Sequence, residues 1–135
     1  MSFNDDVNRF VQKAKVKSDV VYRMALSDLV YDAQESRFKG GNMPIDTSFL
    51  VNSGRASIGS IPTGESKAPA GFTVSEWDSS VTDLVILDIE VGDKFYFGWT
   101  AEYARYMEAR YGFARSAVQN WKTHINNAAA KVRND

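Results

Sequence analysis

The first third of the chain carries apolar residues at intervals of three and four positions. This spacing predicts one long amphipathic helix over residues 4 to about 36. Asn4 is placed to cap the helix, and Asp5 and Asp6 follow in the first turn, where the helix dipole favours acids. The stripe is interrupted around Lys17, so we expect a kink or a stretch of helix that projects past the core. Its apolar members are Val7, Phe10, Val11, Ala14, Val21, Met24, Ala25 and Leu29.

Turn residues divide the next part of the chain. The run from Lys39 to Asn42, which contains two glycines, is expected to stop the helix, and Pro44 follows it. Residues 49–61 alternate loosely between apolar and polar and predict a strand, with Gly54 and Gly59 as candidate bulges. Residues 62–73 contain two prolines and two glycines. We expect a loop there that is mobile in the free protein.

The second half of the chain predicts one further strand and two helices. Residues 78–90 fit either a helix capped by Ser79 or Ser80 or a β-prone segment. Residues 94–99 are aromatic and predict a strand. Residues 101–110 predict a short helix ended by Gly112, and residues 116–132 predict a terminal helix. We therefore expect one α+β domain over residues 1–135, with a small, mainly antiparallel sheet covered by helices.

Composition limits the possible functions. The chain has 135 residues and a formal net charge of -1, without the basic excess that is usual for a free-standing nucleic-acid binder. It contains no cysteine, which excludes disulfides, thiol catalysis and cysteine-ligated zinc. The acidic N-terminus does not resemble a signal peptide, and no apolar stretch approaches the ~20 residues of a membrane-spanning helix.

Candidate catalytic residues are few. His124 is the only histidine, and its neighbours on a helix face would be asparagines and alanine, so we interpret it as structural. Four acids between residues 83 and 93 could form a carboxylate pair for a hydrolase or bind a hard cation; solvated strand ends and a turn explain them better. These acids are Asp83, Asp88, Glu90 and Asp93. We expect no enzyme activity, no metal and no cofactor.

Aromatic residues and arginines alternate between residues 96 and 111. Such a mixture is typical of the centre of a protein–protein interface, and also of a platform for single-stranded nucleic acid. Glu102 and Glu108 each lie three positions from Arg105, so either could pair with it on a helix surface. The residues of the alternating segment are Tyr96, Trp99, Tyr103, Arg105, Tyr106, Arg110 and Tyr111.

Two segments resemble the neck and tail-completion proteins of tailed bacteriophages. In that family, Pro-x-Asp-Thr-Gly precedes a small polar strand, and a later strand leads into Tyr-Ala-Arg-x-x-Glu. Here Ser48 stands where the family has glycine, and the segment after Tyr111 departs from the family pattern. The residues that match are Pro44, Asp46, Thr47, Gly54, Gly59, Tyr103, Ala104, Arg105 and Glu108.

The resemblance implies a structural virion protein at the head–tail joint, made in the host cytoplasm and assembled as several copies around the portal axis. Its partners would be further copies, head-closure or connector proteins, and tail-tube or terminator proteins, with packaged DNA nearby and no membrane. A tail terminator, a minor tail protein and, outside this family, a small nucleic-acid adaptor are alternatives. The expected interface residues are Arg105, Glu108, Tyr106, Arg110 and Lys67. Tyr103 is expected in the core.

Overall fold

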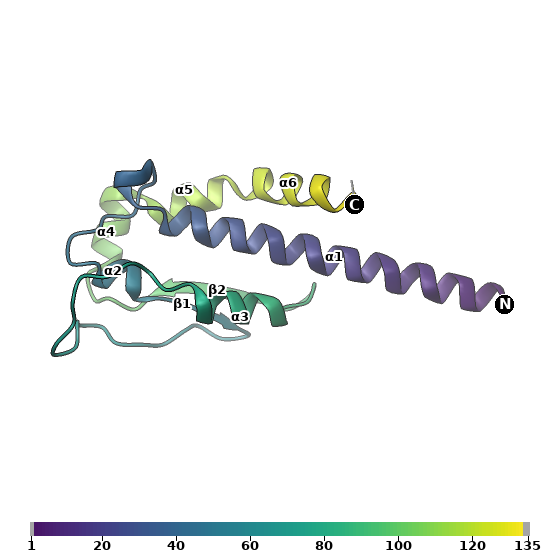
Figure 1. Ribbon diagram of the computed structural model, residues 1–135, viewed down its shortest axis with the longest axis horizontal. Coiled ribbons are helices and arrows are strands. Elements are labelled where there is room, and N and C mark those ends of the chain that lie inside the picture. The colour runs from purple at the N-terminus through teal and green to yellow at the C-terminus, as the bar shows by residue number, and fades with distance from the viewer. Residues whose placement is uncertain (1, 134–135) are drawn as a thin grey trace.

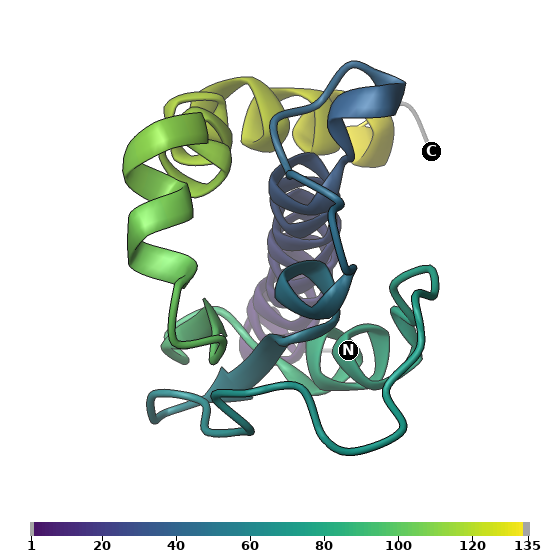
Figure 2. The same cartoon turned by 90° about the vertical axis from the view of Figure 1, so that its left-hand side faces the viewer.

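The computed structural model describes residues 2–133 and has an α+β fold, as predicted. α1 forms a central rod, with α5 and α6 along one side and the two-stranded sheet and α3 along the other (Figures 1 and 2). α4 links the two sides at one end of the molecule. The elements are α1 (Phe3–Gln34), η1 (Arg37–Lys39), α2 (Phe49–Asn52), β1 (Gly54–Ile58), α3 (Ser80–Asp88), β2 (Phe95–Trp99), α4 (Ala104–Tyr111), α5 (Phe113–Gln119) and α6 (Trp121–Arg133).

The long first helix is confirmed, but both of its ends differ from the prediction. Ser2, not Asn4, caps it: the Ser2 hydroxyl accepts a hydrogen bond from the Asp5 amide at 3.2 Å. The helix stops at Gln34, because Glu35 adopts an extended conformation. The glycines expected to stop it lie in the turn after η1, where Gly40 has φ +93°.

The interruption of the apolar stripe marks a projection of the helix. α1 is helical throughout, and the part of residues 4–18 nearest the N-terminus extends beyond the other elements in Figure 1. Every residue in this stretch is exposed, and burial begins at Asp19. We call residues 4–18 the α1 arm. A rise of about 1.5 Å per residue gives the arm a length of about 22 Å.

The strand predicted over residues 49–61 is confirmed only for residues 54–58 and is wrong for the rest. Its first part is the helical turn α2, whose apolar side chains are all buried, and β1 follows it. β1 and β2 are antiparallel, with Gly54 opposite Trp99. Neither expected bulge is present: Gly54 lies in the ladder, and Gly59 forms a turn with φ +85°. A Cβ on Gly54 would lie 2.5 Å from Nε2 of Gln34 and 2.7 Å from the Phe97 ring, so a side chain there would force both to move.

The remaining predictions resolve mostly into helices. The ambiguous segment 78–90 contains α3, and the strand predicted at 94–99 is β2. α4 ends at Gly112, as expected, with φ +68°. The terminal helix predicted over residues 116–132 is wrong in its continuity, because Asn120 separates α5 from α6. No helix within residues 2–133 combines the length and the apolar character needed to cross a membrane.

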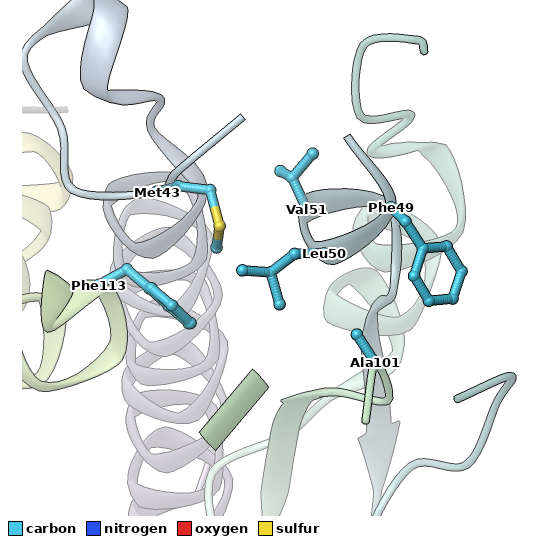
Figure 3. Packing of buried hydrophobic residues seen from close by; sticks show 6 residues of the cluster. All are labelled: Met43, Phe49, Leu50, Val51, Ala101 and Phe113. Atoms are coloured by element: carbon cyan, nitrogen blue, oxygen red, sulfur yellow. The ribbon is translucent and has the colours of Figure 1, made fainter. Parts of the chain in front are cut away.

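The main apolar cluster lies at the end of the molecule where α1 stops. In Figure 3, Met43 and Phe113 point toward Leu50 from the side of α1, while Phe49 points the opposite way. Phe49 meets the ring of Phe72 edge to face, with centroids 5.4 Å apart. Trp99 joins β2 to this cluster through an edge-to-face contact with Phe113 at 4.7 Å. The cluster therefore ties α2, the sheet and α5 together.

A buried amide connects α1 to this cluster. The Gln34 side chain donates to the Val51 carbonyl at 2.9 Å and accepts from the Trp99 indole N–H at 2.7 Å. Both polar ends of the amide are satisfied, which offsets the cost of burying them. Gln34 thereby fixes the position of α2 and β2 against the last turn of α1.

Candidate interaction surface

α4 and η1 together present cations and aromatic rings at one end of the molecule. α4 exposes Arg105, Tyr106 and Arg110, and η1 exposes Phe38, of which 87% is accessible. The guanidinium of Arg37 lies 4.5 Å from the centre of the Tyr111 ring, so η1 and α4 are in contact. We call the exposed side of α4, with Arg37 against Tyr111, the α4–η1 surface; its members are Arg37, Arg105, Tyr106, Arg110 and Tyr111. Phe38 and Lys39 line a different hollow, together with Val74 and Trp77.

α4 is held rigidly against the body of the protein. Half-buried Tyr103 and Ala104 pack against the apolar cluster at the start of the helix. At its end, the Glu108 carboxylate accepts hydrogen bonds from the amides of Ala114 at 2.8 Å and Arg115 at 2.9 Å. A carboxylate at the first turn of α5 is favoured by the helix dipole. The exposed side chains of α4 are therefore presented on a fixed support.

The predicted interface residues separate into two groups. Arg105, Tyr106 and Arg110 are all exposed on α4, with Tyr106 and Arg110 one turn apart, whereas Glu108 is half-buried and bonded within the chain. Within residues 2–133 Arg105 forms no ion pair, so neither expected pairing with a glutamate is present. Lys67 lies outside the α4–η1 surface, in the exposed loop. A role for any of them between subunits stays a prediction.

The loop over residues 62–73 contains no helix or strand, as predicted, but contacts hold it at several points. The Thr100 hydroxyl donates to the Glu65 carbonyl at 2.7 Å, and the Glu102 amide donates to the Ser66 carbonyl at 2.8 Å. The loop also forms one wall of a cleft of about 680 Å³ beside α2, β1 and α3. Lys67 is exposed between these anchors and Phe72. The mobility of the loop stays a prediction.

The segment that resembles the phage family forms a tight, buried turn before α2. Ser48 has φ +64° and ψ +1° and is the one non-glycine residue with positive φ within residues 2–133. L-residues with a side chain are disfavoured in this left-handed region, and glycine is not. The Ser48 hydroxyl accepts a hydrogen bond from the Ser75 amide at 2.9 Å. The side-chain amide of Asn52 donates to the Ser48 carbonyl at 2.9 Å, which further fixes the turn.

The other family-matching residues surround this turn. Pro44 is buried, whereas Asp46 and Thr47 are exposed. The Thr47 hydroxyl accepts a weak hydrogen bond of 3.4 Å from the Phe49 amide at the start of α2. Gly54 is buried where β1 passes the end of α1. The motif residues thus shape the backbone that leads from η1 to the sheet.

The acids proposed for hydrolysis are engaged separately. The Asp83 carboxylate accepts from the Tyr31 hydroxyl at 3.0 Å, and Glu90 lies 3.6 Å from the ammonium group of Lys15. The Asp93 carboxylate accepts from the Glu90 amide at 2.9 Å, and Asp88 is exposed. Within residues 2–133 no group of three or more histidines or acids is placed to hold a metal ion.

His124 joins two helices. Its Nε2 lies 2.9 Å from the Asp32 carboxylate of α1, and the side-chain amide of Asn120 donates to the same carboxylate at 3.1 Å. Both groups therefore attach the start of α6 to α1. Asp32 is far away in the sequence and is a partner that helical spacing could not identify.

Two titratable groups have shifted pKa values. Partial burial, reinforced by the nearby Asp93 charge, raises the pKa of Tyr22 above its ordinary value of 10.0. The Tyr22 hydroxyl donates to the Asp93 carbonyl at 3.2 Å. Hydrogen bonding from the Ser80 amide lowers the pKa of the exposed Asp78 carboxyl. Neither Tyr22 nor Asp78 lies on the α4–η1 surface, so the two pKa shifts reflect contacts within the fold and not the chemistry of that surface.

A scan of protein-family models and searches of curated proteins and solved structures found no match to this chain. The likeness to phage neck proteins therefore rests on the matching residues.

Proposed function

We propose that this chain is a structural protein of the head–tail joint of a tailed bacteriophage, acting in the neck or in tail completion. Several copies would surround the portal or tail axis and join the head to the tail or finish the tail. The protein would be made in the host cytoplasm and would remain in the virion. It would have no catalytic role. A tail terminator or a minor tail protein is the alternative within the same class.

The observation that carries this proposal is the left-handed conformation of Ser48. The residues before it match the family sequence, and the family has glycine at this position. Backbone with φ +64° is the geometry for which glycine is suited. The agreement between a family glycine and a left-handed residue here supports a shared turn. The hydroxyl bond to Ser75 explains how serine is accommodated.

The α4–η1 surface supports an assembly role. Arginine and aromatic residues are enriched in protein–protein interfaces, and they contribute strongly at interface centres. Tyr106 exposes a large ring on the same helix as Arg105 and Arg110, and Arg37 stacks on Tyr111 at the end of that helix. We assign this surface to contact with a neighbouring component of the neck. Further copies, a connector or head-closure protein, and a tail-tube or terminator protein are the candidate partners.

The test is inactivation of the gene in the phage that encodes it. Particles made without the protein should accumulate as filled heads and separate tails, and wild-type protein supplied in trans should restore joining. Supplying Arg105→Ala should restore joining poorly although the variant folds normally. Joined, infectious particles in the absence of the protein would contradict the proposal.

The same surface favours a second candidate, a small nucleic-acid-binding adaptor. Aromatic rings interleaved with arginines can stack bases and neutralise phosphates. Such binding should weaken steeply as salt rises, and Tyr106→Ala and Arg110→Ala should both weaken it. Single-stranded and duplex DNA titrations across a salt series would test it. Absence of saturable binding at low salt would exclude this candidate.

A further inference from the structure

The α1 arm carries an apolar stripe that nothing else within residues 2–133 covers. Val7, Phe10, Val11 and Ala14 follow the i, i+3, i+4, i+7 pattern by which helices dock on apolar surfaces. All four are exposed, and Phe10 is 73% accessible. α1 continues without interruption from the arm into the body of the protein. Because the helix is continuous, the arm does not fold back on the body described by residues 2–133, and the stripe is free to bind another molecule.

α3 exposes a second apolar stripe on the side of the molecule. Thr82 and Ile86 face the interior, while Val81, Leu84 and Leu87 are each about two-thirds accessible. We call the outward side of α3, together with the acids of residues 76–93, the α3 face. From Val81 to Leu87 the stripe is about 9 Å long, and from Val7 to Ala14 the arm stripe is about 10 Å long. The two stripes are matched in length.

The charges around the two stripes are opposite. Residues 7–18 contain four bases and no acid, and residues 76–93 contain six acids and no base. By helical periodicity Lys13 and Lys17 lie on one side of the arm stripe and Lys15 lies on the other. Oppositely charged borders around apolar centres favour association and fix its register. Lys15 already pairs with Glu90 at 3.6 Å, so at the base of the arm the two charged segments are adjacent in one chain.

We propose that the α1 arm of one copy docks on the α3 face of the next copy. The arm and the α3 face are different parts of the surface, so each copy donates one arm and accepts another. Such a head-to-tail contact is heterologous and closes into a ring when the rotation between copies permits. A contact between two short stripes is small, and a single one would be weak. Ring closure by this contact rests on the proposed function, whereas the contact itself does not.

Cross-linking tests this contact without background, because the chain has no cysteine. Full-length Ala14→Cys and Leu84→Cys proteins, carrying different tags, are mixed at low salt and treated with a short bismaleimide. We expect a mixed dimer captured several-fold more efficiently than with Gln12→Cys in place of Ala14→Cys. Gln12 is equally exposed but lies on the opposite side of the arm. Equal capture with both arm cysteines, or none with either, would overturn the inference.

Two further results test whether the arm binds the α3 face and not a second arm, and whether opposite charges contribute to the contact. Pairing of two arms would give Ala14→Cys homodimers without Leu84→Cys and would overturn the inference. For docking on α3, Lys13→Glu should reduce capture several-fold, and Asp88→Lys on the partner should restore it. Both positions are exposed, so circular dichroism and melting should match the parent proteins. Failure of the second change to restore capture would contradict charge pairing between these surfaces.

The fate of this inference is separable from that of the proposed function. Efficient capture by a protein that is missing from phage particles would uphold the contact and refute the neck assignment. A ring seen in the neck, together with cross-linking no better than the Gln12→Cys control, would uphold the assignment and refute the contact.

Discussion

Replacing Ser48 by glycine and by alanine separates the backbone strain at this turn from its hydrogen bond. Both substitutions remove the hydroxyl that accepts from the Ser75 amide, and loss of one such bond costs about 0.5–1.5 kcal/mol. Alanine keeps a Cβ in the left-handed region, where the steric cost is about 1–2 kcal/mol. Glycine removes that cost but makes the unfolded chain more flexible, which offsets it by about 0.4–1 kcal/mol.

Ser48→Gly should therefore unfold at a free energy near that of the parent, and Ser48→Ala about 1 kcal/mol below Ser48→Gly. With about 2.1 cal/mol/K of unfolding entropy per residue, that difference corresponds to about 3–4 °C in melting temperature. Urea unfolding and calorimetry measure both. The control is Ser18 on the exposed side of α1, where glycine should be about 1 kcal/mol less stable than alanine. If Ser48→Gly were no more stable than Ser48→Ala, the left-handed turn and its support for the family would be refuted.

Three other predictions follow from particular contacts. Tyr103→Ala should lower the free energy of unfolding by about 2 kcal/mol, less than the ~3–5 kcal/mol typical of a fully buried aromatic residue, because Tyr103 is half-buried. Arg105→Ala should leave the melting temperature unchanged. A larger loss of stability at Arg105 than at Tyr103 would contradict the assignment of Tyr103 to packing and Arg105 to the surface. Trypsin should cut after Lys67 in the free chain and more slowly in assembled particles, and equal protection in both would count against ordering of the loop by a neighbour. Because the pKa of Tyr22 is raised, its contribution to stability is full below about pH 10 and is lost as the pH rises through the folded pKa, so Tyr22→Phe should flatten the alkaline fall in stability measured by urea unfolding at stepped pH.

The long first helix was predictable because helical spacing recurs on both sides of the interruption at Lys17, and no glycine or proline falls within Phe3–Gln34. The short apolar run before Gly54 was not, since Phe49, Leu50 and Val51 are all buried and a fully buried run has the same pattern in a strand and in a helical turn. In α3, the β-prone residues are helical where Ser79 and Asp83 bond to each other at 2.9 Å and Tyr31 reaches the same carboxylate. Local sequence propensity does not predict such contacts, because Tyr31 is far from α3 in the sequence.

The candidate surface was only partly predictable. Tyr106 and Arg110 lie four positions apart on one helix, so their spacing predicted a shared face. Arg37 joins them through its contact with Tyr111, across more than seventy residues of sequence, which no local pattern reveals. Glu108 matched the family motif and was expected at an interface, yet its carboxylate accepts a hydrogen bond at the start of α5. The sequence did not predict this contact, because the position of α5 depends on the left-handed turn at Gly112.

The most direct measurement of the central claim is a cryo-EM reconstruction of the neck of the intact phage particle. The proposed function predicts several copies of this chain arranged around the portal or tail axis, in contact with the connector or the tail. Docking of the α1 arm on the α3 face would be visible in the same map. Absence of the chain from the particle, or a single copy at an asymmetric site, would contradict the proposed function.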